Sequence, residues 1–540
     1  MRDIPHELEQ RPVTSPASGS SMKRWELLVS ALFILGCILT SIVLLGRLDI
    51  GLYDETAYLQ RGAWIDKQGL PTADMAPLYS LWYRSLQFIV SDPIQRYFAN
   101  YAFTMAALPV LAFALLRISR VALLPSLVTG VFVLLSNSNV LNWPRVSVFA
   151  LIILLIGLIL FLRSERRDRG WFAITAATAV VQFIRPEFAL SLMVLGALWL
   201  FDLVRRKRGG GLITWSYPLA ALVLIAALFV WLGNPFANGR SMIAFGQHYA
   251  LNVIDAGETH VDPWTNWETI AQKDLGTTES LTNALRNAPD RVVWHVLRNV
   301  SQALPTWARM YLPAGARMTW HAWVLLIISA AALLIQVQRV RRAPSDAFMR
   351  ILPIVGALCL PALLSAIVIH PRQHYLLFPA VLLLLMLVRS AYRPRPARTS
   401  GTIPWVPGLA ALLLMGLHLG RPIAPQGRPN LATIHALRSI TSTKPMIILE
   451  ADGGYDAYLP PGTERIKAQA ITTGFSDLLN DSAVNIIVSS PRLERDHRFL
   501  EDPEWRHFRD GGYRSAFNEV AVRGTTTRLF VRRSILVDQP

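Results

Sequence analysis

Eleven apolar segments, each close to the length that an α-helix needs to cross a bilayer, recur through residues 25–420 of this chain. With 52% hydrophobic and only 16% charged residues, the chain has more apolar surface than one soluble core could bury. The repetition therefore predicts a polytopic α-helical membrane protein with about 11 transmembrane helices. The expected spans are about 25–46, 97–116, 121–137, 145–162, 171–184, 187–204, 213–232, 321–338, 351–369, 374–389 and 403–420.

Arginine in the short loops sets the predicted orientation. Arg163–Arg169 and Arg205–Arg208 are basic clusters on either side of the apolar stretch from Trp171 to Phe201. Positively charged loops stay on the cytoplasmic side, and only a helical hairpin that turns at Ile184–Glu187 leaves both clusters there. The amino terminus is then cytoplasmic and the carboxy terminus extracytoplasmic.

The polar regions complete the predicted domain organisation. Residues 1–24 have the composition of a disordered cytoplasmic tail. Residues 25–420 form the transmembrane domain, with long extracytoplasmic loops at 47–96 and 233–320. Residues 421–540 are long enough for a soluble extracytoplasmic domain. Apolar runs at 445–449, 484–488 and 527–531 are typical of buried strands, and a helix is expected at 475–479, so this domain is predicted to be α/β.

The net charge of +17 does not indicate a nucleic-acid partner. The arginines lie in short loops between apolar spans, where they orient the chain and contact lipid head groups, and no basic stripe with interleaved aromatics is present. Cys37 and Cys359 both fall inside apolar spans, so no disulfide is expected.

Adjacent carboxylates, Asp54 and Glu55, follow the first span within the sequence Tyr53-Asp-Glu-Thr-Ala-Tyr58. They are expected at the extracytoplasmic mouth of a membrane helix. One interpretation is that Asp54 only caps a short interfacial helix by accepting bonds from its first N–H groups. The other is that the pair belongs to an active site.

This element resembles the Asp-Glu motif of the GT-C glycosyltransferases that use polyprenyl-phosphate sugars, and protein O-mannosyltransferases and the aminoarabinose transferase of lipid A are the nearest kinds. The resemblance implies that Asp54 is the catalytic base and that Glu55 orients the acceptor or binds an ion. Ala76-Pro-Leu-Tyr79 is similar to the family's Pro-Leu-Tyr element, although the Lys-Pro that often precedes it is missing.

Two further polar clusters are expected at the same side of the membrane. Arg185-Pro-Glu187 resembles a family element at a helix end, although the two charges could simply pair at the interface. The segment from His370 to Tyr375 resembles the Arg-Tyr-x-x-x-Pro element, with His374 at its variable position. With Pro371 at the first helical position, the N–H groups and the guanidinium of Arg372 suit a phosphate.

These elements define the candidate site. The predicted ligands of the donor phosphate are Arg372, Arg185, His370 and His374. The possible substrate-binding residues are Tyr58, Glu187, His248 and Tyr375. His370 and Arg372 could instead be head-group anchors.

No cofactor is certain, and a divalent metal is possible. The potential ligands Asp54, Glu55, Asp74 and His248 are scattered in sequence and form no compact motif. The resemblance gives little further support for a metal, because the segment Ser136–Arg145 lacks the acidic residue that some family members carry in this loop.

The predicted function is transfer of a sugar from a polyprenyl-phosphate donor to a hydroxyl of a glycan, lipid or protein acceptor, on the extracytoplasmic side of the bacterial inner membrane. The family mechanism implies inversion at the sugar. Because the lipid phosphate is the leaving group, the donor needs no nucleotide, and the sequence has no glycine-rich phosphate loop. The alternatives are a transporter or flippase for a lipid-linked glycan component and an inactive scaffold.

Overall fold

The computed structural model describes residues 24–536 apart from 141–143, 209–213, 238–239, 259–262, 314–318, 341–345, 393–426, 443, 469–473, 482, 495, 497–498 and 500. The predicted tail before Arg24 and the predicted span 403–420 lie outside the described residues.

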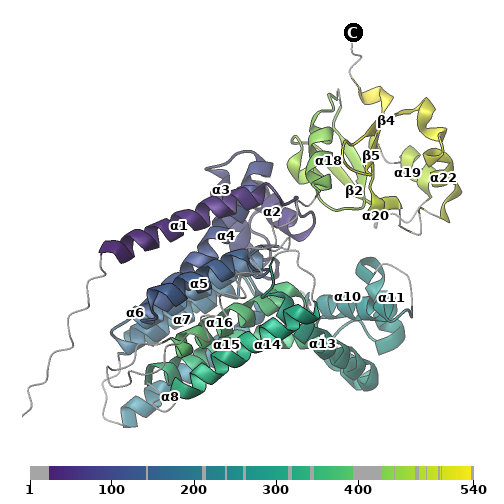
Figure 1. Ribbon diagram of the computed structural model, residues 1–540. Helices are drawn as coiled ribbons and strands as arrows, with labels where there is room; N and C mark the ends of the chain where they lie inside the picture. The colour runs from purple at the N-terminus through teal and green to yellow at the C-terminus, as the bar shows by residue number, and fades with distance from the viewer. Residues whose placement is uncertain are drawn as a thin grey trace, which may run out of the picture.

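The helices at the predicted spans run side by side in one bundle (Figure 1). Each predicted span up to 374–389 coincides with one of them. They are α1 (Arg24–Leu45), α4 (Pro93–Ile118), α5 (Leu123–Leu135), α6 (Val146–Arg163), α7 (Arg167–Val181), α8 (Ala189–Arg208), α9 (Ser216–Leu232), α14 (Trp320–Val340), α15 (Asp346–Val368) and α16 (Gln373–Ala391). Six of the described helices are long and apolar enough to cross a membrane, and α5 and α9 are apolar but shorter. The chain is thus a multi-pass helical membrane protein, while the count of 11 spans is not confirmed.

The helical hairpin predicted from charge is confirmed. Helix α7 ends at Val181, the turn contains the short helix η2 (Pro186–Phe188), and α8 then leads to the basic cluster. At the base of the hairpin, Asp202 accepts a hydrogen bond from Trp171 and is paired with Arg167, and Arg206 pairs with Asp168. These contacts lock the two helices together at their arginine-rich ends.

The two long loops are largely helical. The first contains α2 (Asp54–Gln68), η1 (Ala73–Met75) and α3 (Pro77–Gln87). The second contains α10 (Arg240–Asp255), α11 (Pro263–Leu275), α12 (Leu281–Asn287) and α13 (Pro289–Arg309). Helices α10, α11 and α13 form a group beyond one end of the bundle, on the side where α20 (Pro491–Glu494) of the C-terminal domain lies (Figure 1).

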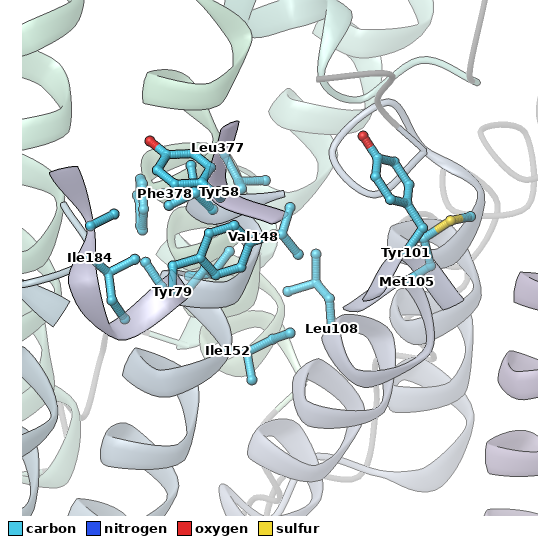
Figure 2. Packing of buried hydrophobic residues seen from close by; sticks show 14 of the residues in the cluster. Tyr58, Tyr79, Tyr101, Met105, Leu108, Val148, Ile152, Ile184, Leu377 and Phe378 are labelled. Atoms are coloured by element: carbon cyan, nitrogen blue, oxygen red, sulfur yellow. The ribbon is translucent and has the colours of Figure 1, made fainter. Parts of the chain in front are cut away.

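The core of the bundle continues without a break beneath α2. Figure 2 shows Tyr58 of α2 and Tyr79 of α3 among apolar side chains of α4, α6 and α16. The Tyr58 and Tyr79 rings meet edge to face with centroids 5.2 Å apart. Helix α2 is therefore packed into the bundle rather than laid loosely over it.

The C-terminal domain is α/β, as predicted. It begins with α18 (Pro429–Arg438) and has a five-stranded sheet in the order β2-β1-β3-β5-β4. The predicted strands correspond to β1 (Ile447–Glu450), β3 (Ile486–Ser489) and β5 (Arg528–Arg532), and the predicted helix to α19 (Phe475–Asp481). The β2-β1-β3 pairs are parallel and the β3-β5-β4 pairs antiparallel. The prediction missed the two edge strands, β2 (Glu464–Lys467) and β4 (Phe517–Ala521), because their exposed polar residues hide the apolar pattern.

Asp49 docks this domain on the bundle. Its buried carboxylate accepts hydrogen bonds from the backbone N–H groups of Asn430 and Leu431, both 3.0 Å long, in the first turn of α18. Burial raises the pKa of Asp49, and these bonds oppose the rise. Nearby, Arg438 pairs with Asp92 at 2.7 Å. A carboxylate at a helix N-terminus is stabilised by the free N–H groups and the helix dipole.

Candidate active site

A cavity of about 870 Å³ lies where the ends of the bundle helices, α2, α10 and the C-terminal domain meet. Most of the residues predicted for the site line it together. They are Asp54, Glu55, Tyr58, Arg185, His248, Arg372, His374 and Tyr375. Glu187 and His370 do not line the cavity, but Glu187 pairs with Arg185 and the ring of His370 stacks on that of His248.

Asp54 is exposed to the cavity as the first residue of α2. The interpretation of Asp54 as a helix cap is wrong, because the capping position is taken by Tyr53 and no side chain caps this helix. Asp54 acts electrostatically on Arg372: burial lowers the pKa of this arginine, while Tyr375 and Asp54 oppose the fall. The carboxylate thus faces the cavity with its charge close to a guanidinium.

Glu55 points the other way, into the protein, and is only 1% exposed. One carboxylate oxygen accepts hydrogen bonds from Tyr79 at 2.6 Å, from Asn100 at 2.9 Å and from Tyr83, and the other accepts one from the backbone N–H of Arg145 at 2.6 Å. Burial raises its pKa, and these bonds counteract the rise. Glu55 therefore joins α2, α3, α4 and the start of α6, and a direct part in catalysis stays a prediction.

Arg185 and Arg372 are both held by aromatic rings. Arg185 pairs with Glu187 at 2.6 Å and lies 5.0 Å from the ring centre of Tyr375. Arg372 lies 4.9 Å from the ring centre of Trp264. The pairing considered for Arg185 and Glu187 is thus present, and it leaves Arg185 on the cavity wall.

Helix α16 begins two positions later than Pro371. Its N-cap is Arg372, whose side chain makes no capping bond and instead lies over Trp264. The expectation that Pro371 occupies the first helical position is therefore wrong. The guanidinium of Arg372 nevertheless lies on the cavity wall close to the first turn of a 19-residue helix, an arrangement that favours anions.

Arg240 is a cavity residue that the sequence prediction missed. It contacts the backbone oxygen of Asp74 and lies 3.7 Å from the sulfur of Met75. Burial, the largest single influence, lowers the pKa of Arg240, but the neighbouring Tyr58 and Glu187 oppose it and the net shift of the pKa is upward. A signal was available, because one face of α10 carries the cavity residues Arg240, Ile243, Ala244, Gln247 and His248 at helical spacing.

The histidines add no positive charge to this cavity at neutral pH. Burial, and then the nearby Arg372, lowers the pKa of His248 to about 3 and that of His370 to about 4. The two rings stack with centroids 5.4 Å apart, and His248 Nδ1 lies 2.6 Å from the carbonyl oxygen of Ala244. At neutral pH the positive charge on the cavity wall therefore lies on the arginines, and phosphate binding by His370 and His374 stays a prediction.

The metal ligands considered from the sequence, Asp54, Glu55, Asp74 and His248, all line the cavity but form no ion-binding cluster. Within the part of the chain that the structure describes, no three His, Cys, Asp or Glu side chains are close enough to hold one ion. Asp54 is exposed in the cavity, Asp74 and His248 are largely buried, and Glu55 accepts hydrogen bonds from Tyr79 and Tyr83.

Fold and site together define a multi-pass helical membrane protein with a carboxylate and several arginines in one cavity beside an α/β domain. Residues 64–275 match the family described as Domain of unknown function (DUF6311). No curated protein matches the sequence.

Among solved structures, the chain is similar to ArnT from Cupriavidus metallidurans bound to undecaprenyl phosphate, with 15% identity, coverage of 96% of this chain and 100% of that chain, and a TM-score of 0.41. It is also similar to ArnT from the same organism in the apo state, with 14% identity, coverage of 94% of this chain and 98% of that chain, and a TM-score of 0.41. At this level of similarity, the function rests on the cavity residues themselves.

Proposed function

We propose that this protein is an integral membrane glycosyltransferase that moves a sugar from a polyprenyl-phosphate donor to an acceptor hydroxyl on the extracytoplasmic side. The observation that carries the proposal is that Asp54 shares one cavity with Arg185, Arg240 and Arg372. A base and a group of cations are what this transfer needs, because the acceptor loses a proton while the leaving phosphate gains charge.

Each residue has a distinct task in this reaction. Arg372 and Arg185, whose planar guanidinium groups can bind phosphate oxygens in pairs, hold the donor phosphate together with Arg240. The acceptor oxygen attacks the anomeric carbon, the bond from that carbon to the phosphate oxygen breaks, and the acceptor proton passes to Asp54. A single displacement of this kind inverts the sugar configuration.

Release of polyprenyl phosphate tests the proposal. The purified protein in lipid nanodiscs is incubated with a panel of polyprenyl-phosphate sugars and an extract of membrane glycans and lipids. We expect release with at least one donor, competition by undecaprenyl phosphate, and a loss of about 100-fold in Asp54→Asn. Thermal stability should not change in this variant, because Asp54 is exposed and makes no capping bond. Donor binding should not weaken, because the charge that is lost acts against the phosphate beside Arg372.

A transporter would behave differently in the same system. If proteoliposomes move the intact donor across the bilayer without releasing polyprenyl phosphate, the transfer reaction is ruled out. Unchanged release by Asp54→Asn would remove Asp54 as the base.

A further inference from the structure

Tyr53, the residue before Asp54, has a backbone conformation that residues other than glycine rarely adopt. Its φ is 76° and its ψ is −119°. Positive φ is uncommon for any residue other than glycine and is strained for a bulky aromatic one. Such a conformation persists only where surrounding contacts enforce it, and the direction of the Asp54 side chain depends directly on it.

The C-terminal domain provides these contacts. The backbone N–H of Tyr53 donates a 2.9 Å hydrogen bond to the carbonyl oxygen of Gly453, and its hydroxyl donates another of 2.9 Å to that of Ala451. Arg492 of α20 lies 4.5 Å from the centre of the Tyr53 ring, and it also lines the cavity. Tyr53 is thus held at its backbone, its hydroxyl and its ring by one domain.

A pair of glycines makes this close approach possible. A Cβ atom at Gly453 would lie 2.7 Å from the Tyr53 ring, and one at Gly454 would lie 2.7 Å from the methyl group of Thr56. Both glycines also have positive φ, 80° and 128°. Only residues without a side chain fit here.

The same loop holds the rest of the first turns of α2. Thr56 and Tyr458 share a hydrogen bond of 2.8 Å, and Gln60 donates one of 2.6 Å to Asp456. The start of α2 is therefore fixed from two sides, by Glu55 inside the bundle and by the C-terminal domain outside it.

From these contacts we propose that Tyr53 is a positioning residue, through which the C-terminal domain holds Asp54 in its working orientation. The inference rests on the proposed function of Asp54 as the base. If Tyr53 is released, its backbone relaxes towards negative φ, the start of α2 turns, and the carboxylate leaves its place opposite the arginines. The donor-binding residues Arg185, Arg240 and Arg372 lie outside α2 and stay in place, so turnover falls while donor binding remains.

Gly453→Ala tests this, with Gly462→Ala as the matched control. Both glycines lie in the C-terminal domain with positive φ, 80° and 91°, so both variants strain their own backbone, but a Cβ at Gly462 meets nothing within 4 Å. Hydrogen exchange of the amides of residues 53–57 reports the contact without any assay of activity. We expect faster exchange in Gly453→Ala only, together with a fall in kcat of about 10- to 100-fold and an unchanged Kd for the donor.

Tyr53→Phe is a milder second variant, because it removes only the bond to Ala451. Tyr53→Phe should speed hydrogen exchange of residues 53–57 and lower kcat, as Gly453→Ala does, but by smaller factors. Equal exchange in both glycine variants would overturn the proposal, and so would faster exchange with unchanged kcat. If no variant or wild type transfers sugar while exchange differs as expected, the contact is real and the proposed function is what fails.

Discussion

Glu55 accepts a 2.6 Å hydrogen bond from the backbone N–H of Arg145, which lies 90 positions further along the chain. This bond joins the helix that presents Asp54 to the start of a helix in the centre of the bundle. The other oxygen of Glu55 accepts hydrogen bonds from two tyrosines and Asn100. The carboxylate of Glu55 therefore holds helices together, whereas the neighbouring Asp54 is exposed to the cavity.

Glu55→Gln should therefore lower stability. Whichever way the Gln amide turns, its nitrogen replaces one accepting oxygen: towards Arg145 it leaves the backbone N–H unpaired, and towards Tyr79 and Asn100 it cannot accept their bonds. A buried donor without a partner costs about 1–3 kcal/mol. We expect a lower midpoint of thermal unfolding in nanodiscs, whereas Asp54→Asn keeps the wild-type midpoint. An unchanged midpoint combined with lost turnover would instead give Glu55 a direct part in the chemistry.

Arg372→Lys separates phosphate binding from membrane anchoring, because Lys keeps the charge but loses the planar fork. We expect weaker donor binding and slower transfer in Arg372→Lys and a larger effect in Arg372→Ala, with expression maintained. Arg298→Lys is the matched control, since Arg298 lies 5.7 Å from the ring centre of Trp294 but does not line the cavity. Titration of the donor against all three variants gives the ranking, and equal affinities would mean that Arg372 only contacts lipid head groups.

Stability should fall on acidification because of the buried histidines. Burial lowers the pKa of His295 and of His370 from 6.5 to about 4. Between these values the unfolded chain binds protons that the folded protein does not, so the free energy of unfolding decreases from about pH 6.5 towards pH 4. His370→Gln removes one such group and should make the decrease shallower.

The exposed His435 on α18 provides the control for this experiment. His435→Gln should leave the dependence of unfolding on pH as it is in the wild type. A wild-type midpoint that does not change between pH 7 and pH 4.5 would contradict the buried, neutral state of these imidazoles.

The predicted orientation can be measured with reporter fusions. A phosphatase that folds only outside the cytoplasm should be active after Thr525, in the turn between β4 and β5, and inactive after Ser164, in the basic loop between α6 and α7. The reverse pattern would invert the chain in the membrane and remove the cavity from the extracytoplasmic side.

Hydropathy and charge predicted most of the bundle, because a helix in lipid must satisfy its backbone internally and its apolar length is visible in the sequence. The hairpin at Ile184–Glu187 is the clearest case, since the arginines on both sides allowed one solution. The interpretation of Asp54 as a cap, one of the two considered, is wrong for a local reason: the capping position is taken by Tyr53, whose backbone conformation no propensity favours.

The rest of the site depends on contacts between distant segments. Arg240 could have been found from the spacing of polar residues along α10, but Arg492 could not, because it enters the cavity only through the docking of the C-terminal domain. The sequence around Arg492 forms a short helix after β3 and has no feature that distinguishes it from other exposed turns of an α/β domain.

The bond between Asp49 and the first turn of α18 makes assembly of the cavity a late event. A ribosome produces Asp49 and Asp54 soon after the first membrane helix, whereas Asn430 and Leu431 follow only after every described helix of the bundle. Until then Asp49 lacks these partners, and Tyr53 lacks its hydrogen bonds to Gly453 and Ala451. A chain truncated before Pro429 keeps every described helix of the bundle but lacks the contacts that hold Asp49 and Tyr53.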